Sequence, residues 1–299
     1  MLYNSPVIFP SGNTPLVGYF IRNTDDVTTK QPTVIVTGSW LTVKEQMPKT
    51  YAEKLAELGY AAFIFDFSGF GQSSGEPKQA EIPARKIKDI IAAVNFLSTI
   101  SFVDPNTIGI LSICASAQYT LAAIARGAQI KSFASVAGWF HDAPSIAHFY
   151  GGAEGVEKRL AYAKRAVEKF AITGEVDLVP AYEPGNDLAG MSFQVDYYGN
   201  SNRGAISEWK NEMATMSWFH WLTFDGLRAA SEVTIPTLFV HGDGCVLPDH
   251  VKQIYAAIQG DKDLLWTEGN QVDFYDQPPL VNKAVSAAHR HFQKTLNLG

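Results

Sequence analysis

Short apolar runs alternate with amphipathic segments along most of this chain. The apolar runs, rich in β-branched residues, are typical of strands that are buried on both faces. They lie at 33–37, 61–66, 108–111, 130–137, 237–242 and 264–266, and helical spacing appears at 49–58, 82–98, 117–125 and 280–296. This alternation predicts right-handed crossovers and a doubly wound, mostly parallel sheet of the α/β class. The preceding residues, 6–22, have the pattern of a β-hairpin.

The alternation stops after Gly138 and resumes at Thr237. The residues between them, 139–236, are rich in Tyr, Trp and Phe and contain amphipathic pieces. We therefore expect an α/β core formed by 1–138 and 237–299, with 139–236 inserted as a helical cap. Such a cap is expected over the edge where the strands end, because ligands bind there in open α/β folds. Additional helices that only extend the core are the alternative.

The stretch from the run 108–111 to the helical segment 117–125 contains only small residues and one thiol, Cys114. A strand that turns sharply into a helix exposes its apex side chain and needs small neighbours, here Ser112 and Ser116. Cys114 is therefore expected at the apex of an elbow. The N-terminus of the following helix is expected to lower the pKa of the thiol and to supply backbone N–H donors. The alternative is a buried, inert cysteine in an ordinary turn.

Composition and charge argue against several classes of binding partner. The chain has 299 residues, a net charge of −6 and no run of Lys or Arg, which argues against nucleic acid and anionic membrane surfaces. No apolar run approaches the roughly 18 residues of a membrane span. Two cysteines far apart in sequence favour a reducing compartment, and the first residues lack the pattern of a signal peptide, so a cytoplasmic location is expected. Cysteine and histidine spacing predicts no metal site, and no cofactor is implied.

Four motifs stand at the ends of the predicted strands. They are Gly38-Ser39-Trp40, Asp66-Phe67-Ser68-Gly69-Phe70-Gly71-Gln72-Ser73, the elbow at Cys114, and His241-Gly242-Asp243-Gly244. Together they resemble the α/β-hydrolase superfamily, and within it the dienelactone-hydrolase-like branch with cysteine in place of serine. The resemblance implies an α/β-hydrolase fold with Cys114 as nucleophile. It also implies an oxyanion site made by the N–H of Ala115 and one from the Ser39/Trp40 loop, and it gives the Asp66 loop a structural role.

The same resemblance leaves the acid and the base unsettled. Counting along the loop after His241 as in the family places the acid at Cys245, whereas a shorter loop places it at Asp243. Gln271 stands where the family has its histidine, and an amide cannot take a proton from a thiol near neutral pH. The remaining candidates that could reach the site are His141, Asp142, His148 and His220. No base is chosen among them.

Three functions follow, in order of preference. The first is a hydrolase or acyltransferase that acts on an ester, thioester or lactone through Cys114, with an atypical or incomplete triad. The second is a non-hydrolytic protein of the same fold that binds a ligand or promotes elimination, cyclisation or isomerisation. The third is a scaffold in which Cys114 is inert. The aromatic residues of the expected cap favour a bulky, largely apolar small molecule as substrate, and a homodimer is left open.

Overall fold

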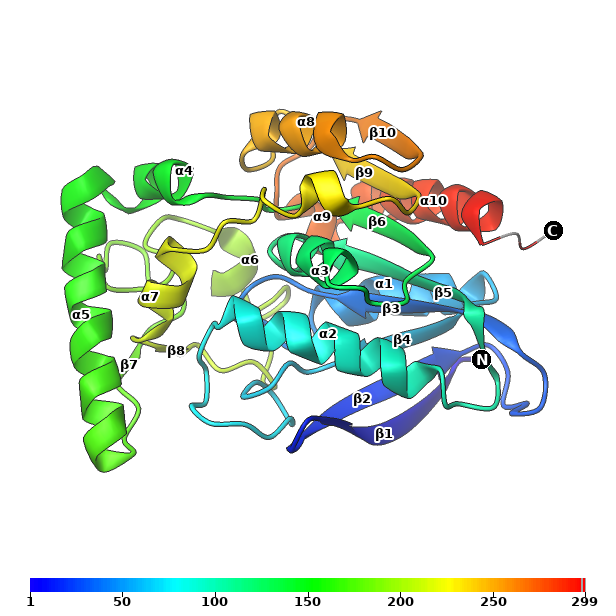
Figure 1. Cartoon of the computed structure of the whole chain (residues 1–299), viewed down its shortest axis with the longest axis horizontal. Coiled ribbons are helices and arrows are strands. Elements are labelled where there is room, and N and C mark those ends of the chain that lie inside the picture. The colour runs from blue at the N-terminus through cyan, green and yellow to red at the C-terminus, as the bar shows by residue number, and fades with distance from the viewer. Residues whose placement is uncertain (297, 299) are drawn as a thin grey trace.

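The computed structural model describes residues 1–296 and 298. Its centre is an eight-stranded sheet in the order β1-β2-β4-β3-β5-β6-β9-β10 (Figure 1). The strands are β1 (Tyr3–Ser11), β2 (Thr14–Arg22), β3 (Gln31–Thr37), β4 (Ala61–Phe65), β5 (Val103–Ile113), β6 (Ser132–Val136), β9 (Thr237–His241) and β10 (Lys262–Trp266). From β4 to β10 all neighbours pair in parallel, and only the β1–β2 hairpin pairs antiparallel, with itself and with β4. The expected α/β fold with a mostly parallel sheet is confirmed.

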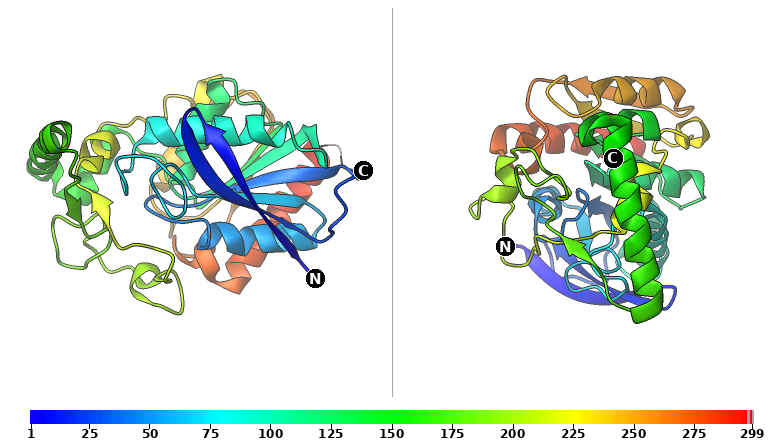
Figure 2. Two further views of the ribbon diagram at one scale, coloured as in Figure 1. Left: turned by 90° about the horizontal axis from the view of Figure 1, so that it is seen from below. Right: turned by 90° about the vertical axis from the view of Figure 1, so that its left-hand side faces the viewer.

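Helices cover both faces of the sheet. They are α1 (Met47–Glu57), α2 (Pro83–Leu97), α3 (Ser116–Ala125), α8 (Pro248–Ala257), α9 (Asp273–Asp276) and α10 (Pro278–Thr295). Helices α1 and α10 lie together on one face, and α2 packs against α3 on the other (Figure 2). Because both faces are covered, β4, β6 and β9 are buried at every position, which explains their continuous apolar sequence.

The segment between β6 and β9 contributes no strand to this sheet among the described residues. It contains α4 (Ala143–Ala147), η1 (His148–Tyr150), α5 (Gly152–Thr173), β7 (Leu178–Val179), α6 (Asp196–Gly199), β8 (Met213–Ala214), α7 (Ser217–Leu222) and η2 (Ala230–Glu232). Strands β7 and β8 form a separate antiparallel pair. Figure 1 places α5 and α7 beyond the carboxyl ends of β5 and β6. The segment thus stands at the edge of the sheet where a ligand site is expected.

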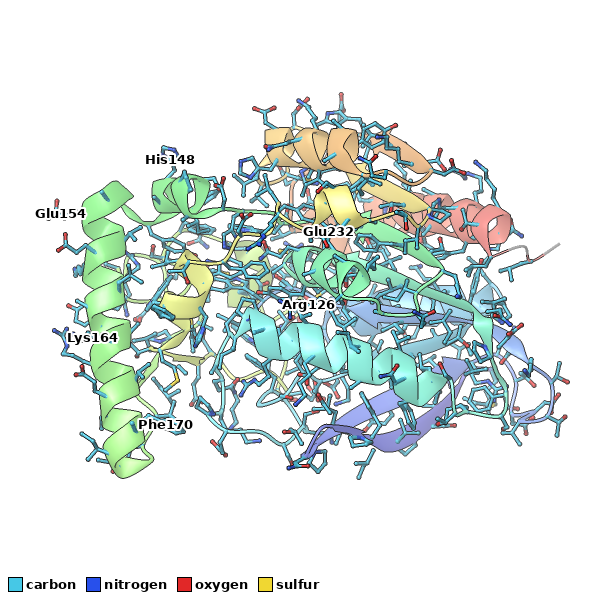
Figure 3. All side chains as sticks on the ribbon, viewed as in Figure 1. Arg126, His148, Glu154, Lys164, Phe170 and Glu232 are labelled. Atoms are coloured by element: carbon cyan, nitrogen blue, oxygen red, sulfur yellow. The ribbon has the colours of Figure 1, made fainter. Side chains whose placement is uncertain are left out.

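Helix α5 is the outermost element of this segment. Glu154 and Lys164 are exposed and point away from the sheet (Figure 3), while Arg159, Ala163 and Ala166 are buried on the opposite side. The Arg159 guanidinium donates to the carbonyls of Tyr150, Gly155 and Asp187. It therefore fixes the start of α5 to the chain on either side.

None of the described helices is both long and apolar enough to cross a membrane.

The loop that follows β4 packs around one buried ion pair. The Asp66 carboxylate accepts from the Lys44 ammonium at 2.6 Å and from the amides of Lys44 and Gln72 at 2.9 Å each. Gly71 has a φ of +49°, and a Cβ there would lie 2.3 Å from an oxygen of Asp66. Only glycine fits at this turn. The loop thus has the structural role expected from its sequence, and it contributes no side chain to the cavity described below.

Candidate active site

The strand–helix elbow is present at Cys114. Its φ of 58° lies in the left-handed region, which is strained for a residue with a side chain. Three backbone hydrogen bonds hold this conformation. The Cys114 amide donates to the Val136 carbonyl at 3.1 Å, and its carbonyl accepts from Ala117 at 3.1 Å and from Trp139 at 3.0 Å. The thiol is therefore presented at a fixed position between the end of β5 and the start of α3.

The two serines that flank the apex are both buried, as the small-residue requirement of the elbow demands. The Ser112 hydroxyl lies 2.9 Å from that of Thr37 on β3 and 2.8 Å from that of Thr120 on α3. This chain of hydroxyls joins two strands to the helix behind the elbow. The Ser116 hydroxyl donates to the Ile113 carbonyl at 3.2 Å. The serines thus satisfy their own polar groups locally and leave the apex to the thiol.

Cys114 opens on a cavity of about 330 Å³. Its walls come from the loops after β3, β5, β6, β9 and β10 and from the segment between β6 and β9. The lining residues are Ser39, Trp40, Cys114, Trp139, Tyr150, Met191, Phe193, Gln194, Val195, Asp196, Tyr198, Gly244, Val246, Asn270, Gln271, Val272 and Tyr275. Although the Cys114 side chain is only 3% exposed, it is not enclosed in sealed packing. A small molecule could reach the sulfur.

Burial raises the pKa of the Cys114 thiol above its usual value, because a thiolate loses its hydration there. The Ser39 and Tyr275 hydroxyls, the Ala115 amide and the Gln271 side chain each favour the thiolate, but their combined effect is smaller. The expectation of a lowered pKa at the start of α3 is therefore wrong. One backbone dipole does not outweigh desolvation at a nearly closed site, so the resting form at neutral pH is the thiol.

Two backbone amides at the elbow have no hydrogen-bond partner in the described chain, as the oxyanion prediction requires. The N–H groups of Trp40 and Ala115 donate to no other group within the described chain. Both residues lie at the elbow end of the sheet, one after β3 and one after β5. The following residue, Leu41, has a φ of 57°, and its amide donates to the buried Glu81 carboxylate at 2.9 Å. The Glu81 carboxylate therefore fixes the backbone of this loop at the residue after Trp40.

Gln271 lines the cavity, at the place expected from its sequence position. Its Nε2 donates to the Ala137 carbonyl at 2.7 Å and to the Tyr275 hydroxyl at 3.3 Å, and its Oε1 accepts from the Val246 amide at 3.2 Å. The amide therefore connects the loops after β6, β9 and β10. It has no free basic atom, so Gln271 orients Tyr275 and the cavity wall rather than accepting the thiol proton.

The two alternatives for the acid lie in different surroundings. The Asp243 side chain is 77% exposed, its carboxylate lies 3.8 Å from the Lys252 ammonium, and it is not part of the cavity wall. Cys245 is buried, and burial raises its pKa to about 12. Both cysteines are free thiols. The structure brings neither candidate to a histidine at the cavity, so the acid role expected for Asp243 stays a prediction.

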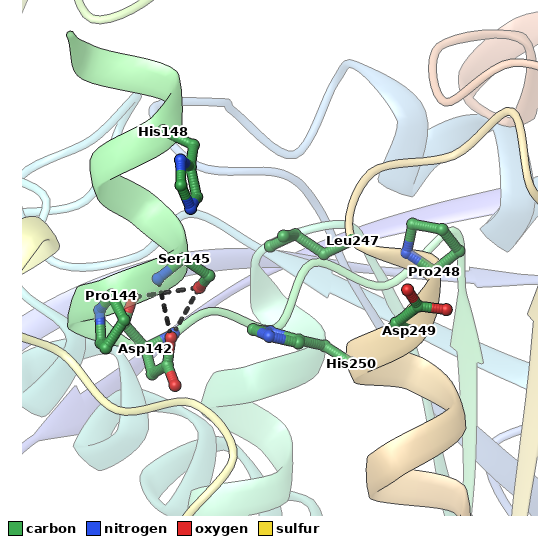
Figure 4. Close-up of a pocket in the computed structure, with 8 residues that line it drawn as sticks. All are labelled: Asp142, Pro144, Ser145, His148, Leu247, Pro248, Asp249 and His250. Atoms are coloured by element: carbon green, nitrogen blue, oxygen red, sulfur yellow. Dashed lines mark hydrogen bonds between the residues drawn. The ribbon is translucent and has the colours of Figure 1, made fainter. Parts of the chain in front are cut away.

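The histidines considered as bases face elsewhere. The His141 ring is buried between the Trp139 indole, which donates to Nδ1 at 2.9 Å, and the Trp221 carbonyl, 2.8 Å from Nε2. Burial lowers its pKa to about 4. His148 and Asp142 line a different, open pocket together with His250 (Figure 4). No histidine, His220 included, is among the residues that line the Cys114 cavity in the described chain.

Two tyrosines complete the surroundings of the thiol, and neither was selected from the sequence. Tyr275 belongs to the short helix α9, one turn after Gln271, so its proximity to that residue could be read from spacing. Tyr198 belongs to α6, far away in sequence. Nothing in its sequence neighbourhood signals that it reaches Cys114.

In the described part of the chain, no three His, Cys, Asp or Glu side chains are grouped so that they could hold a metal ion.

Comparison with known proteins agrees with this geometry. Residues 17–166, half of the chain, match the family model described as the dienelactone hydrolase family. The chain is 28% identical to the uncharacterized protein YcjY of Escherichia coli, over 99% of this chain and 100% of that protein. It is 24% identical to the acyltransferase drtE of Aspergillus calidoustus, over 80% and 79% of the two chains.

Solved structures with the same fold cover the whole chain. The structure of DcsB in complex with its substrate analogue superposes with a TM-score of 0.84 and 19% identity, over 99% of this chain and 100% of that one. The α/β hydrolase GrgF from Penicillium gives a TM-score of 0.83 and 16% identity, over 99% of each chain. At these identities the likeness establishes the α/β-hydrolase fold.

Proposed function

The chain belongs to the dienelactone hydrolase family, and from this we propose that it is a hydrolase or acyltransferase that transfers an acyl group from an ester, thioester or lactone through Cys114. One observation carries the proposal. A thiol at a strained backbone apex opens on a cavity where the amides of Trp40 and Ala115 have no other partner. This is the arrangement of groups that acyl transfer requires.

The first step forms a bond between the Cys114 sulfur and the carbonyl carbon of the substrate. The electron pair of the C=O bond moves to the oxygen, and the amides of Trp40 and Ala115 stabilise the resulting oxyanion. The oxyanion then collapses, the bond to the leaving group breaks, and the proton of the thiol ends on that leaving group. The acyl-enzyme is discharged by water in a hydrolase, or by an alcohol or thiol acceptor in an acyltransferase.

Among the three substrate classes a thioester is favoured, because no group of the described chain at the cavity is placed to protonate an alkoxide leaving group. No histidine lines the cavity in the described residues, and burial raises the pKa of the thiol. An alkoxide leaving group needs a general acid to protonate it. A leaving thiolate is far less basic than an alkoxide, so it can depart without a general acid. The aromatic walls favour a bulky, largely apolar acyl group.

The test is covalent trapping with an activated acyl thioester, followed by intact mass measurement. The wild-type protein is expected to gain one acyl group, and Cys114→Ala none. The matched control is Cys245→Ser, which changes the other buried thiol and is expected to acylate like the wild type. The proposal is wrong if the wild type stays unmodified while it binds the thioester, or if the acyl group is found on Cys245.

A second candidate is ligand binding, elimination, cyclisation or isomerisation without a covalent step. The observation in its favour is Gln271, whose amide replaces a base with a fixed hydrogen-bond donor. In that case binding or turnover would persist in Cys114→Ala. The same variant therefore distinguishes the two functions, since acyl transfer through the thiol is lost with the sulfur.

A further inference from the structure

The cavity at Cys114 is nearly closed, and the segment between β6 and β9 closes it from two sides. The thiol is only 3% exposed, so a bulky ligand needs one side to move. On the first side, Trp221 of α7 stacks on Trp40 of the loop after β3, with 4.4 Å between ring centroids. Both indoles are buried, and buried aromatic pairs gain stability from their large contact area as well as from their geometry. This side is therefore firmly attached to the core.

An arginine holds the second side. Arg203, which follows α6, makes a bidentate ion pair with Asp276 of α9, because its Nε donates to Oδ2 at 2.8 Å and its Nη2 to Oδ1 at 2.6 Å. Nη2 also donates to the Val272 carbonyl at 3.2 Å, and Nη1 donates to the Asp196 carboxylate at 3.1 Å. Paired contacts of this kind fix a guanidinium in one orientation. One side chain thus connects α6 with the loop and helix after β10.

The partners of Arg203 belong to the wall of the cavity. Asp196 lines it from the segment between β6 and β9, and Val272 lines it from the core. Tyr198 of α6 and Tyr275 of α9 line it as well. Arg203 itself is not among the lining residues. It therefore holds two walls of the cavity together from behind and leaves the space for a ligand free.

The ion pair is only partly shielded from water. The side chains of Arg203 and Asp276 are 14% and 21% exposed. Asp276 raises the pKa of the Arg203 guanidinium further above its usual value, so the charge is present at every pH at which the protein is folded. A partly exposed pair can exchange its partner for water and dissolved ions, and it weakens as salt is added. The second side is therefore the weaker attachment.

The part of the chain that this ion pair holds is short. Immediately after Arg203, the Gln46 side chain on the core donates to the Gly204 carbonyl at 2.6 Å, so the chain is fixed there by a second, neutral contact. Residues 193–199 precede Arg203 and include α6. Five of them line the cavity, namely Phe193, Gln194, Val195, Asp196 and Tyr198. Movement of this stretch away from α9 would widen the cavity beside Cys114.

We propose that the Arg203–Asp276 ion pair is a clasp that holds residues 193–199 against α9, and that opening of the clasp admits bulky ligands to Cys114. The stacked indoles of Trp40 and Trp221 keep the first side closed during this movement. The clasp does not depend on the proposed acyl transfer, because it governs access to the thiol and not the reaction of the thiol.

The experiment measures access to the sulfur in Cys245→Ser, where Cys114 is the only cysteine. A small reagent, iodoacetamide, and a bulky one, N-phenylmaleimide, are each reacted at the same alkaline pH and followed by intact mass. The ratio of the two rate constants, bulky over small, reports opening because the intrinsic reactivity of the thiol cancels. Adding Asp276→Asn or Arg203→Gln is expected to raise this ratio about three- to fivefold, as loss of a partly exposed ion pair would give.

Salt provides a second measurement on the same proteins. Raising the NaCl concentration from about 0.05 M to about 1 M should raise the ratio about twofold where the ion pair is intact, because salt screens the two charges. The ratio should not respond to salt once Asp276→Asn has removed one of them. A ratio that responds equally in both proteins would assign the effect of salt to another contact and would contradict the clasp.

Asp177→Asn is the matched control. The Asp177 carboxylate lies 2.6 Å from the Lys169 ammonium, but both residues belong to the segment between β6 and β9, so this pair does not reach the core. It should leave the ratio unchanged. The proposal is overturned if neither Asp276→Asn nor Arg203→Gln raises the ratio, or if Asp177→Asn raises it as much. It is also overturned if both reagents accelerate equally, since the thiol itself would then have changed, or if N-phenylmaleimide labels none of the proteins.

Failure of the clasp and failure of the proposed function give different results. Acyl transfer is judged by the mass gained from a thioester, whereas the clasp is judged by a ratio of alkylation rates. A protein that takes no acyl group but shows the expected ratios would contradict the first and keep the second. Thermal melts verify folding of each variant. If Arg203→Gln does not fold, Asp276→Asn decides the question, because it keeps the shape of the side chain and the contact of Arg203 with Val272.

Discussion

At the scale of single residues, Cys114 combines two properties with opposite consequences for the proposed acyl transfer. Its backbone is strained so that the sulfur faces a cavity, yet burial raises the pKa of the thiol. A cysteine with a paired histidine is a thiolate at neutral pH. In the proposed acyl transfer the thiolate of Cys114 must therefore be produced during the reaction, which predicts a different dependence on pH.

We therefore expect the second-order rate constant for acylation of the wild type to rise with pH throughout the neutral range. Below the raised pKa of Cys114 the thiolate fraction increases tenfold per pH unit, so the logarithm of the rate constant should climb with a slope of about one from pH 6 to pH 8. Stopped-flow acylation by the activated thioester measures this profile. A plateau that begins near pH 7 would mean that a base with the pKa of histidine acts on the thiol.

The outcome for individual residues shows what a single sequence can provide. Cys114 and Trp40 line one cavity, and their places could be predicted because they depend on local features, namely strand ends and the small residues of the elbow; the roles assigned to Cys114, Trp40 and Ala115 stay predictions. The raised pKa of the thiol was missed because burial depends on side chains from distant loops. Tyr198 was missed for the same reason, since α6 reaches the cavity only through tertiary packing.

At the scale of elements, one buried carboxylate connects the loop after β3, which carries the Trp40 amide, with α3 and α2. Glu81 accepts from the Leu41 amide at 2.9 Å, from the Tyr119 hydroxyl on α3 at 2.7 Å, and from the Lys86 ammonium on α2 at 2.7 Å. The Lys86 ammonium also lies over the ring of Phe70, 4.6 Å from its centroid. Glu81 therefore fixes the loop after β3 relative to the helix that follows Cys114.

Glu81→Gln is expected to lower the free energy of unfolding by about 3–5 kcal/mol, because it leaves the Lys86 charge buried without its partner. It should also slow acylation, since the loop loses its anchor. Urea denaturation and the acylation assay measure the two effects. The control is the double variant with Lys86→Met, which removes both charges and should recover most of the stability. Equal destabilisation by the single and double variants would show that the ion pair is not the source.

Helices and strands were predicted well where burial in the core restricts the sequence to apolar residues. The strands β3, β4, β6 and β9 were located to within a few residues, because burial on both faces imposes continuous apolar runs. The start of β5 was placed too late. Its first half is polar and pairs with β3 across an irregularity between Gln31 and Thr33, so it carries no apolar signal. Short elements such as α6 and α9 also lack a period long enough to detect.

For the whole molecule, the central question is how the segment between β6 and β9 is held over the sheet. Aromatic side chains make the connection. Trp221 of α7 stacks on Trp40 of the loop after β3, with 4.4 Å between ring centroids, and packs on Trp139 at 5.7 Å. Its indole N–H donates to the Tyr150 hydroxyl at 3.2 Å. Trp221 therefore joins the loop after β3 to two other walls of the cavity.

Trp221→Ala should therefore affect stability and acylation together. Removing a buried tryptophan leaves a cavity and costs about 3–5 kcal/mol of unfolding free energy. Because Trp40 loses its stacking partner, its amide should be less well placed, and acylation should slow beyond what the unfolded fraction explains. Phe219→Ala on the same helix is the control, since the Phe219 side chain is 52% exposed and should change neither quantity by much. Slower acylation in Trp221→Ala at conditions where the variant is fully folded would show that the aromatic contact positions the oxyanion loop. An unchanged rate would mean that other contacts, such as the hydrogen bonds of Leu41 with Glu81 and Trp209, hold the loop after β3 without this stack.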